Sequence, residues 1–189
     1  MDGYWEQFKA PFLCFAGFSG VGKTTLVERL VTRFREENIR VGYYKHDSHQ
    51  FKMDKTGKDT ARVRHAGAGI VAINDPTHFG VLADNDFKQL TITHALERCD
   101  CILIEGYKQS PFNKIVFLDA KGKLPIPSNS QGIRAIVHQG IGISEQFVEQ
   151  GVPLFHRDEV EKIFDFVNGH FKNCASELFG AVFVGGQST

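Results

Sequence analysis

Short apolar runs alternate along this chain with segments whose apolar residues recur at helical spacing. Phe12–Ala16 is an apolar run of strand length, and Leu26, Leu30 and Phe34 follow it on one face of a predicted helix. Further strand-like runs occur at 39–45, 70–74, 80–83, 101–105, 114–118, 133–137 and 152–155. Further helical patterns cover 54–66, 87–98, a short segment ending at 151, and 158–171. The alternation predicts an α/β fold with a doubly wound, mostly parallel sheet and helices on both faces.

The pattern also suggests how the chain is divided. Residues 1–173 are predicted to form a single domain, since a chain of 189 residues is long enough to bury one sizeable core. The tail 174–189 contains the apolar run 178–184 and ends in Gly-Gly-Gln-Ser-Thr. This tail fits either an extra edge strand or a disordered end, and the pattern does not choose between them.

Composition narrows the class of protein. Lys+Arg and Asp+Glu are balanced at 22 each, so no basic field favours a nucleic acid and no polybasic segment favours a membrane. No apolar run approaches the roughly 18 residues of a membrane span, and the acidic N-terminus lacks a secretory pattern. The four cysteines include no C-x-x-C pair, which argues against structural zinc. We therefore expect a cytoplasmic protein that binds neither nucleic acid nor membrane.

The junction between the first strand and the first helix carries the strongest motif. Residues 17–24 read G-F-S-G-V-G-K-T and match G-x-x-x-x-G-K-[ST] at every fixed position. Glycines let such a loop curl so that its backbone N–H groups point at phosphate oxygens, and the helix that follows adds its positive N-terminus. Lys23 is expected to reach the β- and γ-phosphates, and the Thr24 hydroxyl to bind Mg²⁺. The motif predicts a P-loop nucleotide-binding fold.

A carboxylate is expected beside this loop, because ligands of open α/β sheets bind beyond the carboxyl ends of the strands. Glu105 directly follows the apolar residues 101–104, which is the setting of the second nucleotide motif, a strand-end acid near Mg²⁺. The competing acid, Asp100, precedes the same strand and should lie at its opposite end. Glu105 is therefore the predicted acidic residue on the Mg²⁺ side of the site, and the alternative is a strand-end glutamate with a capping role.

Two further polar segments follow the second strand. Lys45, His46 and Asp47 stand at its expected carboxyl end, together with His49. The two histidines are either metal ligands or phosphate contacts, or the segment is an ordinary solvated loop, and Asp47 is a candidate Mg²⁺ contact, direct or through water. Residues 54–60 open a helix, where Asp59 serves either as an N-cap or as a group facing phosphates.

Nothing in the pattern selects the base of the nucleotide. The guanine-reading pattern N-K-x-D is absent, since residues 113–116 read N-K-I-V.

Taken in order, these motifs resemble one family. The P-loop at 17–24, K-H at 45–46, D-K-T-G-K-D-T at 54–60, A-G-A at 66–68 and E-G-Y-K at 105–108 are similar to those of the MobB family of molybdopterin-guanine dinucleotide biosynthesis adaptors. The similarity covers about 12–171, and the segment 47–50 is less rich in histidine than is common in that family. The resemblance implies GTP and Mg²⁺ as ligands, weak GTPase activity and a homodimer. It also implies a partner molybdopterin guanylyltransferase that attaches GMP to molybdopterin.

The same resemblance carries site residues onto this chain. Lys23 and Glu105 would be the catalytic residues, and Thr24, Glu105 and Asp47 the metal-side residues. The nucleotide-binding residues would be Gly20, Val21, Gly22, Lys23, Thr24, Thr25, Lys45, His46, Asp54, Lys58 and Asp59.

Two alternatives use the same loop. A small-molecule kinase would need a lid carrying arginines, whereas the polar connection 119–131 carries lysines and no arginine. A metal-delivery GTPase would hold nickel or zinc at His46, Asp47 and His49, but the chain has no long histidine-rich tract.

Overall fold

The computed structural model describes residues 10–46, 59–84, 92, 94–127, 130–140 and 151–184, with side chains up to residue 174. The chain divides into two compact units. Unit 1 contains Lys9–His46 and Cys99–Thr189, and unit 2 contains Asp47–Arg98 with Asp2–Phe8. The prediction that 1–173 act as one domain stays a prediction.

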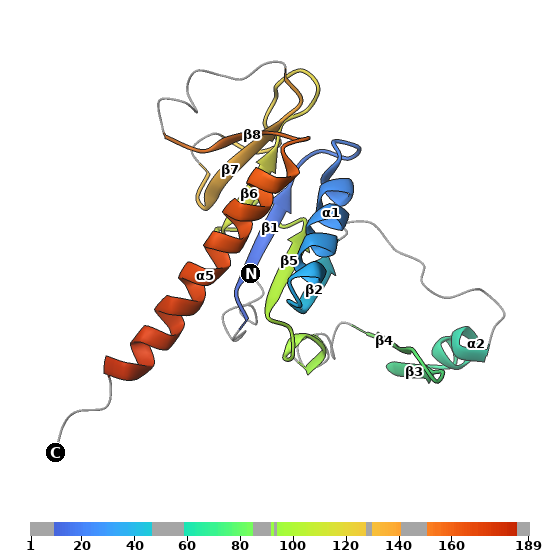
Figure 1. Ribbon diagram of the computed structural model, residues 1–189. Coiled ribbons are helices and arrows are strands. Elements are labelled where there is room, and N and C mark those ends of the chain that lie inside the picture. The colour runs from blue at the N-terminus through green and yellow to red at the C-terminus, as the bar shows by residue number, and fades with distance from the viewer. Residues whose placement is uncertain are drawn as a thin grey trace. The chain divides into compact units, whose positions relative to one another are not determined.

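A six-stranded parallel sheet forms the centre of unit 1 (Figure 1). Its order is β2-β5-β1-β6-β7-β8, and each pair of neighbours is parallel. The strands are β1 (Phe12–Ala16), β2 (Val41–Lys45), β5 (Cys101–Glu105), β6 (Lys114–Phe117), β7 (Ile133–His138) and β8 (Leu154–His156). The predicted strands of this unit and the α/β class are confirmed, and β8, which contains no proline, is one of the two edge strands, as predicted.

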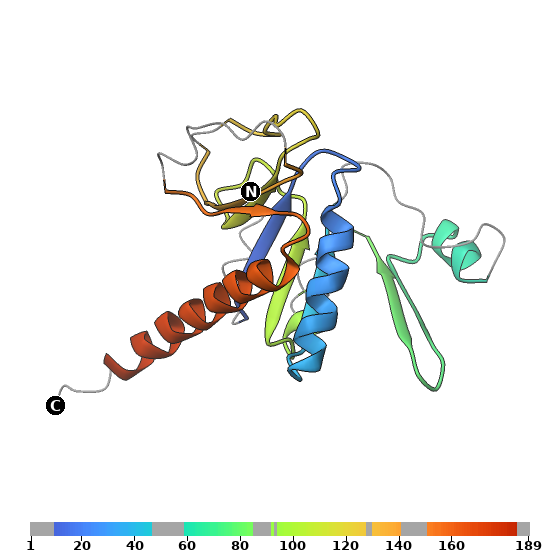
Figure 2. The same cartoon turned by 45° about the horizontal axis from the view of Figure 1, so that its top comes forward.

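Helices α1 (Lys23–Glu36) and α5 (Val160–Val184) pack on one face of this sheet (Figures 1 and 2). Their inward side chains form one core with the alternating residues of β1, β5, β6 and β7 that point to the same side. Ile102 and Ile104, which point to the opposite side, are also fully buried. Burial on both faces explains why these strands read as continuous apolar runs rather than as alternating patterns.

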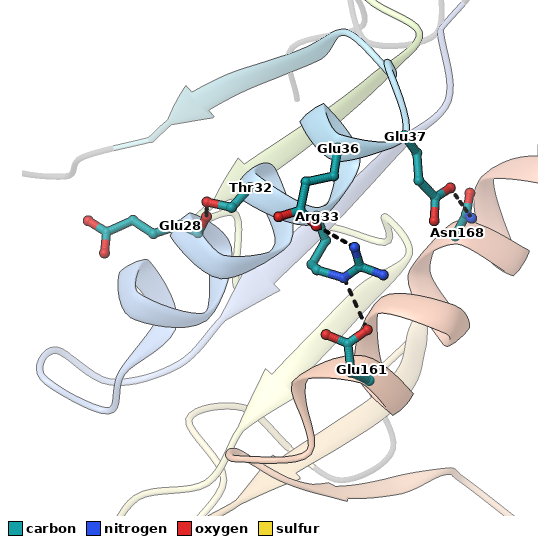
Figure 3. Close-up of polar contacts among 7 residues, drawn as sticks. All are labelled: Glu28, Thr32, Arg33, Glu36, Glu37, Glu161 and Asn168. Atoms are coloured by element: carbon teal, nitrogen blue, oxygen red, sulfur yellow. Dashed lines mark hydrogen bonds and ion pairs between the residues drawn. The ribbon is translucent and has the colours of Figure 1, made fainter.

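The contact between α1 and α5 combines aromatic packing with exposed polar contacts. Phe164 is 2% exposed and its ring centroid lies 4.8 Å from that of Phe34. The Arg33 guanidinium lies 5.0 Å over the Phe164 ring, and its Nε donates a hydrogen bond of 3.0 Å to Glu161 (Figure 3). Since exposed ion pairs contribute little, the buried rings carry most of the stability of this contact.

We expect Phe164→Ala to lower the free energy of unfolding by about 3–5 kcal/mol, because it leaves a cavity between two helices. The urea unfolding midpoint of the purified chain measures this effect. Phe164→Leu is the matched control and should recover part of the loss. An unchanged midpoint in the alanine variant would show that α5 does not depend on this ring.

Unit 2 contains a short helix and a hairpin. Helix α2 (Asp59–His65) precedes β3 (Ile70–Asn74), which pairs antiparallel with β4 (Phe79–Ala83). Asp75 builds the turn: its Oδ1 accepts from the backbone N–H of Thr77 and of His78, each at 2.7 Å. These hydrogen bonds lower the pKa of Asp75 to about 2. Both predicted strands of this unit are confirmed.

The structure answers the question that the tail left open. Helix α5 is continuous over Val160–Val184 and runs past the edge of the sheet (Figure 2). The edge-strand interpretation of 178–184 is therefore wrong, and 185–189 lie outside the described residues. The short helix ending at 151 and most of the helix at 87–98 also lie outside them, although 92 and 94–96 are helical. None of the described helices has the length and apolarity needed to cross a membrane.

Candidate functional site

The phosphate-binding loop joins the carboxyl end of β1 to α1, as the motif predicts. Gly20 and Gly22 adopt φ angles of 77° and 91°, which residues with a Cβ rarely adopt. Gly17 is constrained by space: a Cβ added there would lie 2.9 Å from the Cβ of Phe117. The two fixed glycines of the motif, Gly17 and Gly22, and the additional Gly20 therefore each have a direct structural cause.

Lys23 folds back over this loop. Its Nζ donates a hydrogen bond of 2.7 Å to the carbonyl of Phe18 and lies 3.9 Å from Oε1 of Glu105. Burial lowers the pKa of Lys23 and the Glu105 carboxylate opposes that shift, while Lys108 and Lys45 lower the pKa further. The three ammonium groups thus repel one another around a single carboxylate, which makes this part of the site receptive to an anion.

Glu105 is the acid that faces the loop. It ends β5 and is only 7% exposed. Its Oε2 accepts hydrogen bonds from the hydroxyls of Thr24 at 2.9 Å and Tyr43 at 3.1 Å. Asp100 lies at the other end of the same strand, where its Oδ2 accepts from the backbone N–H of Arg40 at 2.7 Å. The structure therefore brings Glu105, and not Asp100, to Lys23 and Thr24.

Sequence reasoning missed Tyr43. Burial and the adjacent Glu105 raise the pKa of its hydroxyl to about 12, so Tyr43 stays a hydrogen-bond donor at neutral pH. Only part of the signal lies in the sequence: alternation along a strand puts Tyr43 on the same face as Lys45, but the pairing of β2 with β5 that brings Tyr43 to Glu105 comes from the structure.

His46 and Tyr107 form the outer wall beside Glu105. The two rings stack with centroids 4.4 Å apart, and the backbone N–H of His46 donates to the carbonyl of Glu105 at 2.8 Å. Gly106 has a φ of 121°, and a Cβ there would lie 2.8 Å from the carbonyl oxygen of His46. This glycine therefore lets the two strand ends approach each other. Tyr107, which follows it, was also missed as part of the site.

Four of the other predicted site residues are not tested by the structure. Asp47, Asp54 and Lys58 lie outside the described residues. Asp59 begins α2 in unit 2, and its side chain is 99% exposed, with Oδ1 3.9 Å from Arg62 Nη1. In the described ranges, no three His, Cys, Asp or Glu side chains gather as metal ligands. The roles of these four residues stay predictions.

The partial match to N-K-x-D is explained by structure rather than by base recognition. Lys114 begins β6 and is fully buried, and its Nζ donates to the backbone carbonyls of Ser110 and Gln131. Burial lowers the pKa of this lysine. Lys114 therefore belongs to the core at the amino end of the sheet, opposite the phosphate loop.

The residues present fit a magnesium ion. Thr24 Oγ1 and Glu105 Oε2 lie 2.9 Å apart at the mouth of the loop, and hydroxyl and carboxylate oxygens are the ligands that Mg²⁺ prefers. Lys23 Nζ lies 3.9 Å from the same carboxylate. Phosphate oxygens bound by Lys23 would therefore be close enough to contact the ion as well.

Comparisons with known proteins agree with this geometry. Residues 12–139 match the family described as Molybdopterin guanine dinucleotide synthesis protein B, MobB. An Escherichia coli molybdopterin-guanine dinucleotide biosynthesis adapter protein is 34% identical over 83% of this chain and 91% of its own length. A Bacillus subtilis protein, described as a probable adapter of the same biosynthesis, is 32% identical over 86% of this chain and 94% of its own.

The fold agrees as well. The crystal structure of Bacillus subtilis MobB aligns with a TM-score of 0.61 and 28% identity, covering 82% of this chain and 97% of that one. The P-loop, the parallel sheet and the extent of these matches lead to one conclusion: the chain belongs to the MobB family.

Proposed function

We propose that this protein is a GTP-binding adaptor with weak GTPase activity, which assists a guanylyltransferase in attaching GMP to molybdopterin. The observation that carries the proposal is the group formed by Lys23, Thr24 and Glu105 at the mouth of the loop. The relatives named above, described as adapters of molybdopterin-guanine dinucleotide biosynthesis, support the pathway. We propose the cytoplasm, where a nucleotide-dependent biosynthesis would run, as its location.

The residues have separate tasks in this proposal. The loop N–H groups and Lys23 hold the β- and γ-phosphates, while Thr24 and Glu105 hold Mg²⁺. When bound, the ion would supply positive charge that offsets the charge of the phosphates. Tyr43 orients the carboxylate of Glu105 through its hydrogen bond. The chain therefore has the parts needed to bind a nucleotide tightly.

The side chains that surround Glu105 predict slow hydrolysis of GTP. The described side chains there are hydroxyls, lysines and the rings of His46 and Tyr107. Fast phosphoryl transfer to water needs a group that orients the water and an arginine that stabilises charge. Neither a glutamine nor an arginine is among those described neighbours. A slowly hydrolysed nucleotide suits an adaptor that holds GTP for a partner enzyme.

Binding and turnover measurements test this proposal. Calorimetry should show GTP binding that depends on Mg²⁺, and phosphate release should stay far below the 1–100 s⁻¹ or so that is typical of kinases. Failure to bind GTP in the presence of Mg²⁺ would refute the proposal. Rapid transfer of the γ-phosphate to a metabolite would instead favour the kinase alternative.

We also propose that the protein is a homodimer in which the hairpin of unit 2 takes part. Phe79 is 73% exposed and lies on one face of the hairpin, while Ile73 is 62% exposed and lies on the other. A two-stranded hairpin is marginally stable alone, and apolar side chains on both faces favour insertion into a partner. A second copy offers the same strand edges and the same side chains.

We expect Phe79→Asp to shift the protein from dimer to monomer in light scattering coupled to gel filtration. The substitution puts a charge into the proposed apolar contact, whereas the exposed position tolerates aspartate in the isolated chain. Lys121→Asp, in an exposed loop of unit 1, is the control and should remain dimeric. A dimeric Phe79→Asp variant would exclude this hairpin as the contact.

A further inference from the structure

The strands on the two sides of the phosphate loop differ, and this difference predicts which way a bound nucleotide extends from the loop. Glu105 lies on β5, on one side of β1, whereas β6, β7 and β8 lie on the other side. A γ-phosphate held near Thr24 and Glu105 leaves the α-phosphate and the nucleoside pointing away from β5. The nucleoside would then lie over the carboxyl ends of β6–β8. This step rests on the function proposed above.

Distance along the sheet limits where the base can lie. Neighbouring strands are about 4.8 Å apart, so β7 lies about 10 Å and β8 about 15 Å from β1 along this edge. An extended nucleotide with its phosphates in the loop reaches that far. The residues that follow β7 and β8 are thus the ones a base would meet.

These residues form a connected polar group. His138 and His156 end the two strands as register partners, with ring centroids 5.5 Å apart. The next residues also meet: Arg157 Nη1 donates to Gln139 Oε1 at 3.2 Å, and the Arg157 backbone N–H donates to the carbonyl of His138 at 2.9 Å. Asp158 follows, with its side chain 65% exposed and its Oδ2 3.4 Å from His156 Nδ1.

We propose that Asp158, with Arg157 and Gln139, reads the base of the nucleotide and selects guanine. A carboxylate only accepts hydrogen bonds, and guanine presents two adjacent donors, N1–H and the N2 amino group. Adenine presents a lone pair at N1, which an aspartate repels. Arg157 and Gln139 supply N–H donors for O6 of guanine. This set of groups replaces the N-K-x-D pattern that the chain lacks.

The local backbone holds these groups in place. The Gly140 N–H donates to His138 Nδ1 at 3.0 Å, and the His156 N–H donates to Glu159 Oε2 at 2.8 Å. A side chain thus fixes the end of each of the two strands. Asp158, which follows β8, is therefore presented from an ordered turn. A metal role for the two histidines finds no support, since the described residues include no three-ligand cluster.

The test compares four ligands with Mg²⁺ by calorimetry: GTP, xanthosine triphosphate, ATP and inorganic tripolyphosphate. Xanthine carries a carbonyl where guanine carries its amino group, so an asparagine amide fits xanthine and a carboxylate fits guanine. We expect Asp158→Asn to weaken GTP binding by about 10- to 100-fold and to strengthen binding of xanthosine triphosphate. Tripolyphosphate binding should not change, which also shows that the variant is folded. Asp165→Asn, exposed on α5, is the matched control and should bind all four ligands as the unchanged protein does.

The results separate this inference from the function on which it rests. Equal GTP affinity of Asp158→Asn and the unchanged protein would overturn the inference and leave the adaptor proposal intact. Equal affinity of the unchanged protein for GTP and tripolyphosphate would also overturn it, since no base would be read. Failure of the unchanged protein to bind GTP or tripolyphosphate would count against the adaptor proposal itself.

Discussion

Lys23→Ala is expected to weaken GTP binding by about 100-fold or more, because each hydrogen bond to a charged group contributes roughly 1.5–3 kcal/mol and Lys23 would contact two phosphates in the proposed site. In the structure, the Lys23 ammonium is held by the carbonyl of Phe18 and faces Glu105. Its removal leaves the loop glycines and the core in place. Calorimetry measures the affinity, and thermal unfolding shows whether the fold is retained.

Lys121→Ala is the control for this experiment, because Lys121 is exposed and lies in the loop that follows β6. It should bind GTP as the unchanged protein does. Normal GTP binding by Lys23→Ala would mean that the nucleotide does not use this loop, and the site assignment would fail with it.

Glu105→Gln is expected to have the second large effect. The amide keeps an oxygen that can accept from Thr24 and Tyr43, but it removes the negative charge that would hold Mg²⁺ in the proposed site. We expect the dependence of GTP binding on Mg²⁺ to be lost and GTP hydrolysis to fall by roughly 100-fold, as when one charge-stabilising group is removed from an active site. Binding with and without Mg²⁺, together with phosphate release, separates the two effects.

Glu161→Gln on α5 is the matched substitution outside the site, since Glu161 is exposed and contacts Arg33. It should leave both measurements unchanged. If Glu105→Gln retained full dependence on Mg²⁺, the acid on the metal side of the site would have to lie elsewhere in the chain.

The parts of the site that were predicted from sequence are those encoded by local pattern. The loop motif fixes its own backbone, because Gly20 and Gly22 adopt left-handed angles that few other residues tolerate. Glu105 could be preferred over Asp100 because parallel strands place their carboxyl ends at one edge, where the loop also lies. In both cases, a few residues that are neighbours in the sequence are enough to predict the feature.

Other features depend on contacts between distant segments. Tyr43 belongs to the site only because β2 pairs with β5, and the residue by itself reads as an ordinary strand aromatic. The sequence predicts an edge strand or a disordered end for the apolar run at 178–184, because a short apolar run does not reveal a helix by periodicity alone, and the structure shows it as a continuation of α5. The proposed base-reading group likewise joins residues from the ends of two strands.

Stimulation of a partner enzyme tests the central claim most directly. Purified protein is added to a molybdopterin guanylyltransferase with molybdopterin, Mg²⁺ and limiting GTP, and the formation of molybdopterin guanine dinucleotide is followed over time. Our account predicts a clear increase in product formation with the unchanged protein and none with Lys23→Ala. No increase with the unchanged protein at limiting GTP, or an equal increase with Lys23→Ala, would contradict it.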